Sequence, residues 1–156
     1  MPRRRKVIRK RVFSDPVYGD FEVAKFVNNL LKDGKKSLAY RIFYDMLDII
    51  KERTKEDGLA VFKKAVSQVR PKLEVRPRRV GGATYQIPME VPPARSLALA
   101  MRWILISARA RKGKPMAERL ADEIIEASRG EGASIKKREE THKMAESNRA
   151  FAHYRW

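Results

Sequence analysis

The sequence has no cysteine and only two histidines, His142 and His153, among 156 residues. Without cysteine the chain forms no disulfide and offers no thiolate to a metal ion. Two histidines are too few and too scattered to indicate a metal site or a catalytic triad, so we interpret each as a surface or packing residue. The glycine–lysine pairs at 34–35 and 113–114 lack the earlier glycine of a P-loop. We therefore predict a protein that is not an enzyme and has no cofactor and no metal site.

Long apolar runs are also missing. No stretch approaches the roughly 18 apolar residues that cross a bilayer, and the basic residues at the N-terminus are not followed by the apolar segment of a signal peptide. Together with the absence of cysteine, these features predict a cytoplasmic protein with no membrane partner.

Acidic residues are scarce relative to basic ones. The chain has 36 Lys and Arg against 19 Asp and Glu, a net charge of +17. Such an excess destabilises a compact globule unless a polyanion neutralises it. Nucleic acid is the first candidate and an anionic membrane surface the second. The length predicts one domain with a substantial core.

One stretch, residues 70–91, has the composition of a β-hairpin. Two runs rich in β-branched and aromatic residues flank Gly81-Gly82, a dipeptide suited to the positive φ angles of a two-residue turn. With this turn, Val80 pairs with Ala83 and the pairs continue outward along both strands. The prolines at 77 and 88 then both fall in non-hydrogen-bonded pairs, where a missing N–H breaks no ladder bond. The two prolines thus independently predict one register.

The charge on this hairpin indicates its use. Arg76, Arg78 and Arg79 cluster toward the tip, and Arg78 lies opposite Tyr85, which places a guanidinium and an aromatic ring on one face. Because a two-stranded ribbon is not stable alone, we expect it to project from a helical body into a groove of a nucleic acid. The alternative is a hairpin folded flat on its own domain with its arginines solvated.

The rest of the chain has helical periodicity. The predicted helices cover about residues 20–31, 37–54, 59–69, 94–111, 115–128 and 133–148, and Asp20 is a natural N-cap for the first. We expect the second helix to direct Leu38 into the core. The fourth is apolar nearly all round, so we expect it to be central and buried.

The last helix is far more polar than the others. Its apolar positions, Ile135, Met144 and Ala145, are too few for a full core face. We expect it to dock lightly and to expose its basic residues, which are Lys136, Lys137, Arg138 and Lys143.

Both ends of the chain are basic. Residues 1–12 hold seven Lys and Arg with almost nothing to bury, which predicts a disordered arm that orders against phosphates, or else a solubilising tail. Residues 149–156 interleave aromatic and basic side chains, a pattern equally suited to stacking on bases and to pinning the terminus to the body.

The predicted fold class is mainly α: a six-helix bundle with one protruding two-stranded β-hairpin and a basic N-terminal arm. The arm covers residues 1–19, and the helical domain covers residues 20–156 with the hairpin at about 72–91.

Several motifs resemble the bacterial small-subunit ribosomal protein seven family. They are the hairpin sequence from Val80 to Val91, the Gly34-Lys-Lys36 loop and the ending from Met144 to Trp156. The arginine-rich start and residues 98–103 fit as well, so the resemblance covers essentially the whole chain. Ser147 stands where the family leads us to expect alanine, at a position we expect to be exposed.

This resemblance implies a structural component of the small ribosomal subunit, built as a helical bundle with a β-ribbon. Such a protein binds small-subunit (16S) ribosomal RNA in the 3′ major domain and nucleates assembly of the head. It lies at the subunit interface near the decoding centre, the exit-site tRNA and the mRNA path, with ribosomal proteins nine and eleven as neighbours. Repression of its own operon, known for some members, stays open.

The resemblance, with the charge pattern, also suggests which residues bind RNA. Those expected on ribosomal RNA are Arg3, Arg4, Arg5, Lys6, Arg9, Lys10, Arg11, Lys35, Lys36, Arg76, Arg78, Arg79, Arg109, Arg111, Lys112 and Lys114. Those expected on the tRNA and mRNA side are Gly81, Gly82, Tyr85, Lys136, Arg138 and Lys143. Cationic side chains on A-form RNA recognise mainly shape and backbone.

Two other functions remain as alternatives. A basic ribbon can also enter a groove of DNA, as in architectural chromatin proteins. An enzyme acting on nucleic acid would need a catalytic constellation, and the sequence offers none.

Overall fold

The computed structural model describes residues 13–154, with every side chain in that range except that of Val80. Each predicted helix is present, with its ends within about one residue of the expectation, so the mainly α fold class is confirmed. The elements are α1 (Phe21–Leu30), α2 (Lys36–Thr54), α3 (Gly58–Val69), β1 (Leu73–Val80), β2 (Ala83–Glu90), α4 (Pro93–Ala110), α5 (Met116–Ser128), α6 (Ala133–Ser147) and the 3-10 helix η1 (Arg149–Tyr154).

Aspartates fix the starts of two helices. The Asp20 carboxylate accepts the Glu22 N–H at 2.7 Å and caps α1, as predicted. Asp57 caps α3 in the same way. At the first residue of α3, a Cβ on Gly58 would lie 2.6 Å from the Leu47 carbonyl oxygen, so only glycine lets α3 approach α2 this closely.

The core begins with three phenylalanines, one from each of the first three helices. Phe26, Phe43 and Phe62 are fully buried, and their ring centroids lie 5.1–5.8 Å apart in tilted and edge-to-face contacts. The core continues through the apolar faces of α4, α5 and α6, which contribute Met101, Ile104, Leu120, Ile124 and Ile135. This single core holds the six helices together.

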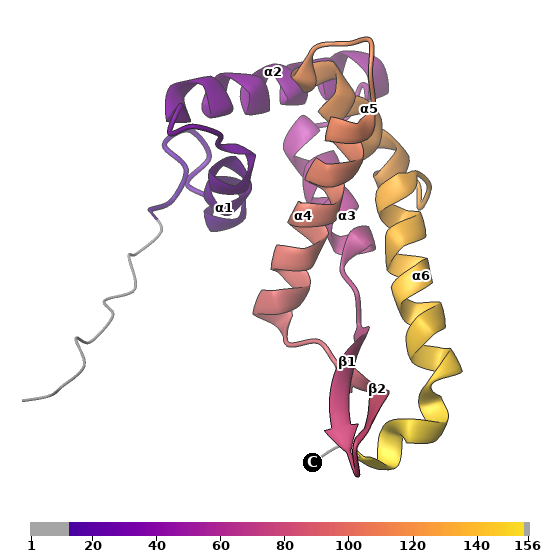
Figure 1. Cartoon of the computed structure of the whole chain (residues 1–156). Coiled ribbons are helices and arrows are strands. Elements are labelled where there is room, and N and C mark those ends of the chain that lie inside the picture. The colour runs from indigo at the N-terminus through magenta and orange to yellow at the C-terminus, as the bar shows by residue number, and fades with distance from the viewer. Residues whose placement is uncertain (1–12, 155–156) are drawn as a thin grey trace, which may run out of the picture.

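The hairpin has the predicted register. Val80 pairs with Ala83, and Val75 lies opposite Pro88. Gly81 and Gly82 adopt φ values of 57° and 89°, which a two-residue hairpin turn of the primed type requires. The hairpin protrudes beyond α1–α5, as Figure 1 shows.

The hairpin does not protrude alone. The second half of α6 runs alongside it, and η1 turns back beneath it (Figure 1). The Phe151 and Tyr154 rings of η1 lie 5.2 and 5.4 Å from the Tyr85 ring of β2. Two roles were predicted for the C-terminal segment, stacking on bases and attaching the terminus to the body of the protein. Residues 149–154 have the second role. Trp156 lies outside the described residues.

Two expectations about burial are wrong. Leu38, in the first turn of α2, is 46% exposed. The helix α4 is not buried all round: Ile106 is 57% exposed, since the other helices cover only one face of α4. That open face of α4 is the start of the candidate site.

Candidate nucleic-acid interface

The exposed face of α4 carries a stripe of arginines. Arg95, Arg102 and Arg109 are all exposed and follow one another at intervals of seven residues, which is close to two full helical turns. Ala98 and Ile106 fill the exposed positions between them. No acidic residue occurs between residues 91 and 117, so α4 presents cations with no carboxylate of its own. We call these five residues the α4 stripe.

Both ends of the α4 stripe are anchored to neighbouring elements. At one end, Arg109 Nη2 donates to the Leu30 carbonyl at 3.3 Å, at the C-terminus of α1. At the other, Arg95 Nε lies 2.9 and 2.8 Å from the two carboxylate oxygens of Glu74, at the base of the hairpin. The α4 stripe thus connects the end of α1 to the hairpin.

Glu74 joins the α4 stripe to the arginines of the hairpin. It is 6% exposed and also accepts Arg76 Nε at 2.7 Å. Burial alone would raise the pKa of Glu74, but the hydrogen bonds from Arg95 and Arg76 outweigh it and lower the pKa. The carboxylate therefore stays ionised and orients both guanidiniums, whose combined charge still exceeds its own.

The predicted residues of the hairpin tip differ in their surroundings. Arg79 is exposed, as are Gly81 and Gly82. Arg78 is half-buried, opposite Tyr85 as predicted. Tyr85 is half-buried too, and the rings of η1 described above pack against it. Tyr85 thus contacts the protein's own C-terminal segment.

The loop between α1 and α2 adds cations near the end of α1. Lys35 and Lys36 are exposed, and Lys36 Nζ lies 5.7 Å from the centre of the Tyr40 ring. This cation–π contact holds the Lys36 stem against α2 and leaves its charge at the surface.

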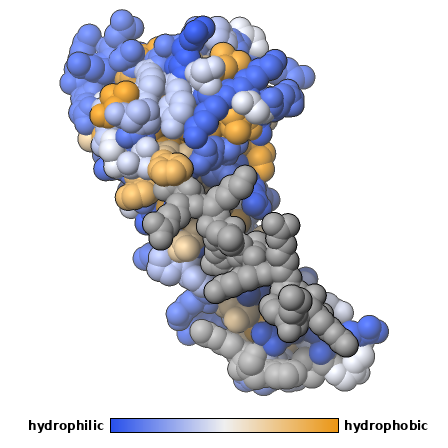
Figure 2. Space-filling model, turned by 90° about the vertical axis from the view of Figure 1, so that its left-hand side faces the viewer, coloured by the Kyte–Doolittle hydropathy of each residue, from blue (hydrophilic) through white to orange (hydrophobic). Residues whose placement is uncertain are grey.

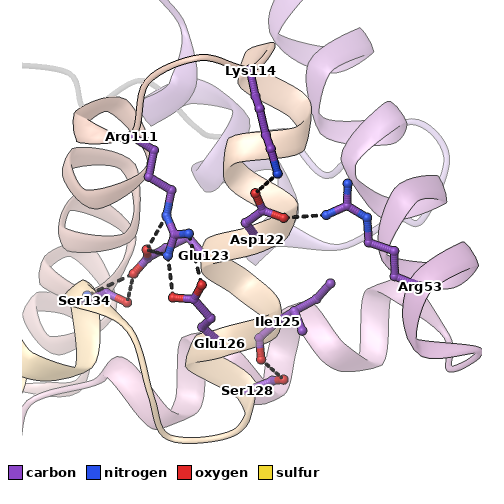
Figure 3. A network of polar contacts seen from close by, with 9 residues as sticks. All are labelled: Arg53, Arg111, Lys114, Asp122, Glu123, Ile125, Glu126, Ser128 and Ser134. Carbon is purple, nitrogen blue, oxygen red and sulfur yellow. Dashed lines mark hydrogen bonds and ion pairs between the residues drawn. The ribbon is translucent and has the colours of Figure 1, made fainter.

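The basic corner after α4 divides into two kinds of residue. Arg109 and Lys112 are exposed. Arg111 is turned inward: its Nη2 lies 2.7 Å from the fully buried Glu123, and it also pairs with Glu126 (Figure 3). Hydrogen bonding, first to Glu126 and then to Glu123, raises the pKa of Arg111 against the opposing effect of burial. The predicted role of Arg111 in RNA binding therefore has no support in this geometry.

Lys114 is exposed but paired. Its Nζ lies 3.0 Å from Asp122, which also accepts a hydrogen bond from Arg53 (Figure 3). Burial would raise the pKa of Asp122, and these two cations lower it instead. The charge of Lys114 is thus largely balanced within the protein.

The predicted residues of α6 also divide. Lys136 and Lys143 are exposed. Arg138 is half-buried and donates to the Gln68 carbonyl near the end of α3. Four residues further along the same face of α6, the His142 Nε2 accepts the Lys72 N–H at 2.9 Å, just before β1. Arg138 and His142 therefore fix α6 to the base of the hairpin.

In the described part of the chain, one group of acidic side chains makes no contact with the arginines of the α4 stripe. They lie on the second half of α2 and on α5, where the described carboxylates are Asp45, Asp48, Glu52, Glu118, Asp122, Glu123 and Glu126. Figure 2 views the molecule from the side of α1 and shows hydrophilic residues over most of that face, with hydrophobic ones in small separate groups.

The described residues contain neither a candidate metal site nor a helix that could span a membrane. No group of three or more His, Asp or Glu in residues 13–154 could hold a metal ion. In the same part of the chain, no helix is long and apolar enough to cross a bilayer. The predicted arm residues Arg3–Arg11 lie outside the described range.

Sequence reasoning missed Arg95 and Arg102, although their spacing of seven residues with Arg109 was a visible signal. Because α4 was expected to be wholly buried, these arginines were not considered as candidates for binding RNA. The sequence also contains no indication of the buried Glu123, because its partners Arg111 and Ser134 come close to it only in the folded chain.

Comparison with known proteins gives a consistent match. The model of the family described as ribosomal protein S7p/S5e matches residues 2–149. A curated relative from Thermotoga petrophila is 60% identical over 154 residues, covering 99% of both chains. Relatives from Dictyoglomus turgidum and Magnetococcus marinus are 59% and 60% identical over 156 residues, the full length of both chains. All three are named small ribosomal subunit protein uS7.

Proposed function

Because the chain belongs to the ribosomal protein S7p/S5e family, we propose that it is a structural protein of the small ribosomal subunit that binds 16S ribosomal RNA directly. The proposed target is the 3′ major domain, where binding nucleates assembly of the head. The family is one of ribosomal structural proteins and is not an enzyme family.

The α4 stripe is the observation that carries this proposal. Its three arginines lie on one face, where Glu74 pairs with Arg95 and Arg76 and leaves a net positive charge, and the array continues through Arg76 onto the hairpin. Such an array neutralises phosphates along a folded strand and releases their counterions, which is the main source of affinity in protein–RNA binding. Lys35 and Lys36 extend the array beyond α1, and the arm residues Arg3–Arg11 would add further contacts.

The second part of the proposal concerns the tip of the hairpin and the outer face of α6. We place the exit-site tRNA and the mRNA path near Arg79, Gly81-Gly82, Lys136 and Lys143, at the subunit interface near the decoding centre. Tyr85 and Arg138 serve this surface by positioning its elements, since both contact the protein itself. Ribosomal proteins nine and eleven are the proposed neighbours, and no surface is assigned to them.

Filter binding to a transcript of the 3′ major domain tests the proposal. The protein should bind this transcript tightly, and an excess of duplex DNA should not displace it. If duplex DNA competed as well as the RNA, an architectural DNA-binding role would replace the proposed one.

A matched pair of variants tests whether the α4 stripe is the surface that binds RNA. Arg102→Gln removes a cation from the centre of the α4 stripe, whereas Arg129→Gln removes an exposed cation next to α5. Because one charged hydrogen bond contributes about 1.5 kcal/mol, Arg102→Gln should weaken binding roughly tenfold. Arg129→Gln should bind like the unmodified protein. Equal losses in the two variants would show that charge alone, and not the α4 stripe, determines affinity.

A further inference from the structure

A groove of about 310 Å³ lies between α1 and α4, beside the α4 stripe. Its floor is apolar and comes from α4: Leu97 and Met101 are buried, and Ala98 is exposed with only a methyl group. The small side chain of Ala98 leaves the floor open to solvent. The groove has room for a nucleobase, and its floor offers apolar side chains against which a base can pack.

The rim of the groove is polar and comes from α1. Lys25, Asn28 and Asn29 are exposed there. The Asn29 Nδ2 lies 3.7 Å from the Met101 sulfur, a weak contact that turns this side chain toward the floor. Among residues 13–154 no hydrogen bond to the Asn28 amide is present, so its donor and acceptor are open to a ligand. An amide beside an apolar surface offers a hydrogen-bond donor and an acceptor side by side to a ligand that packs on that surface.

The charges around the groove indicate which kind of ligand it can bind. Lys25 and Arg102 lie on its two helices, and the acidic residue of α1, Glu22, is bound by Arg70 at 2.6 Å. Phosphates are therefore favoured outside the groove, while its apolar floor excludes them. A nucleotide whose base enters the groove and whose phosphate stays on the cations satisfies both regions.

We propose that this groove receives one unpaired adenine from the bound RNA. The base lies on Leu97, Ala98 and Met101, and its Watson–Crick edge, with the N6 donor next to the N1 acceptor, pairs with the Asn28 amide. An asparagine amide can pair with a neighbouring donor and acceptor of adenine, and the Watson–Crick edge of an unstacked base is a usual site of sequence recognition in RNA. The inference rests on the proposed function and adds base discrimination to binding that would otherwise depend on shape and charge.

Two variants test the groove without removing charge. Ala98→Leu fills the floor, and Asn28→Ala removes the amide. Both positions are exposed, so neither change should lower the thermal unfolding midpoint, which circular dichroism checks. Since one lost base contact costs about tenfold in affinity, each variant should bind the 3′ major domain transcript roughly tenfold more weakly. The dependence of affinity on salt should not change, because no phosphate contact is lost.

Chemical probing of the transcript identifies the base. Dimethyl sulfate methylates N1 of unpaired adenines, so the unmodified protein should protect one adenine that Ala98→Leu leaves reactive. Hydroxyl-radical protection of the RNA backbone should persist in the variant. Unchanged affinity and unchanged adenine protection in Ala98→Leu would overturn the groove and leave the proposed function intact. Failure of the unmodified protein to bind the transcript would instead overturn the proposed function.

Discussion

Charge is arranged differently on α5 and on α4. On α5 and the end of α2, cations meet carboxylates: Arg53 and Lys114 share Asp122, and Arg111 binds Glu123 and Glu126 (Figure 3). On α4 three arginines follow one another on one face: Arg95 is bound by Glu74, Arg109 donates to the Leu30 carbonyl, and Arg102 contacts no acidic side chain among residues 13–154. The comparison shows that a net charge of +17 does not by itself locate the binding surface. Pairing within the protein decides which cations stay available.

The buried carboxylate on the α5 side gives the largest expected effect. Glu123 accepts Arg111 and also Ser134, whose N–H and Oγ lie 2.9 and 2.6 Å from Glu123 Oε1 at the start of α6. Replacing Glu123 by alanine leaves the first turn of α6 without its acceptor and leaves Arg111 with Glu126 as its one carboxylate partner among the described residues. We expect the free energy of unfolding to fall by about 3 kcal/mol, measured by urea denaturation.

The half-exposed Glu126 is the matched control. Its side chain is 41% exposed, so Glu126→Ala should cost below about 1 kcal/mol. Losses of equal size in the two variants would mean that burial does not set the importance of these charges.

The aromatic contact at the hairpin gives a smaller effect. Phe151→Ala removes one ring packed on Tyr85, an aromatic contact worth roughly 1 kcal/mol. Because η1 supports one face of the hairpin, the amides of β2 should exchange hydrogen several-fold faster in the variant. Amides of the α3 core provide the internal reference. If β2 exchanged at its original rate, η1 would not hold the hairpin.

The smallest expected effect is on the pH dependence of stability. Burial first, and then the charges of Arg138 and Lys72, lower the pKa of His142 below its ordinary 6.5. The unfolded chain therefore binds this proton more readily, so stability is complete above pH 6.5 and decreases as pH falls toward the folded-state pKa. His142→Gln, which does not titrate, should lose less stability than the unmodified protein between about pH 7.5 and pH 5 in urea. Equal losses would contradict the role of His142 in fixing α6 to the hairpin.

Local signals made much of this fold predictable. Gly81-Gly82 and the two prolines determine the hairpin register because turn geometry and missing N–H groups act within a few residues. Asp20 determines the start of α1 for the same reason. The exposure of the lysines in the α1–α2 loop and of Arg76 and Arg79 also agrees with the sequence, because basic clusters seldom lie in a core.

What could not be predicted depends on long-range contacts. Tyr85 was expected to face RNA, but its ring packs against Phe151 and Tyr154, more than 60 residues later in the chain. The internal roles of Arg111 and Arg138 depend in the same way on partners from other helices. Periodicity indicated that α4 is apolar, but only the packing of the other helices shows which face stays open.

The salt dependence of RNA binding tests the central claim most directly. One triple variant replaces Arg95, Arg102 and Arg109 by glutamine, and its matched control replaces Arg53, Lys114 and Arg129. If the α4 stripe binds phosphates, the slope of log K against log salt should become shallower by about 2 in the first variant, since each lost contact removes roughly 0.7 to 0.9. The control should keep the original slope. Equal slopes in the two variants would contradict the assignment of RNA binding to the α4 stripe.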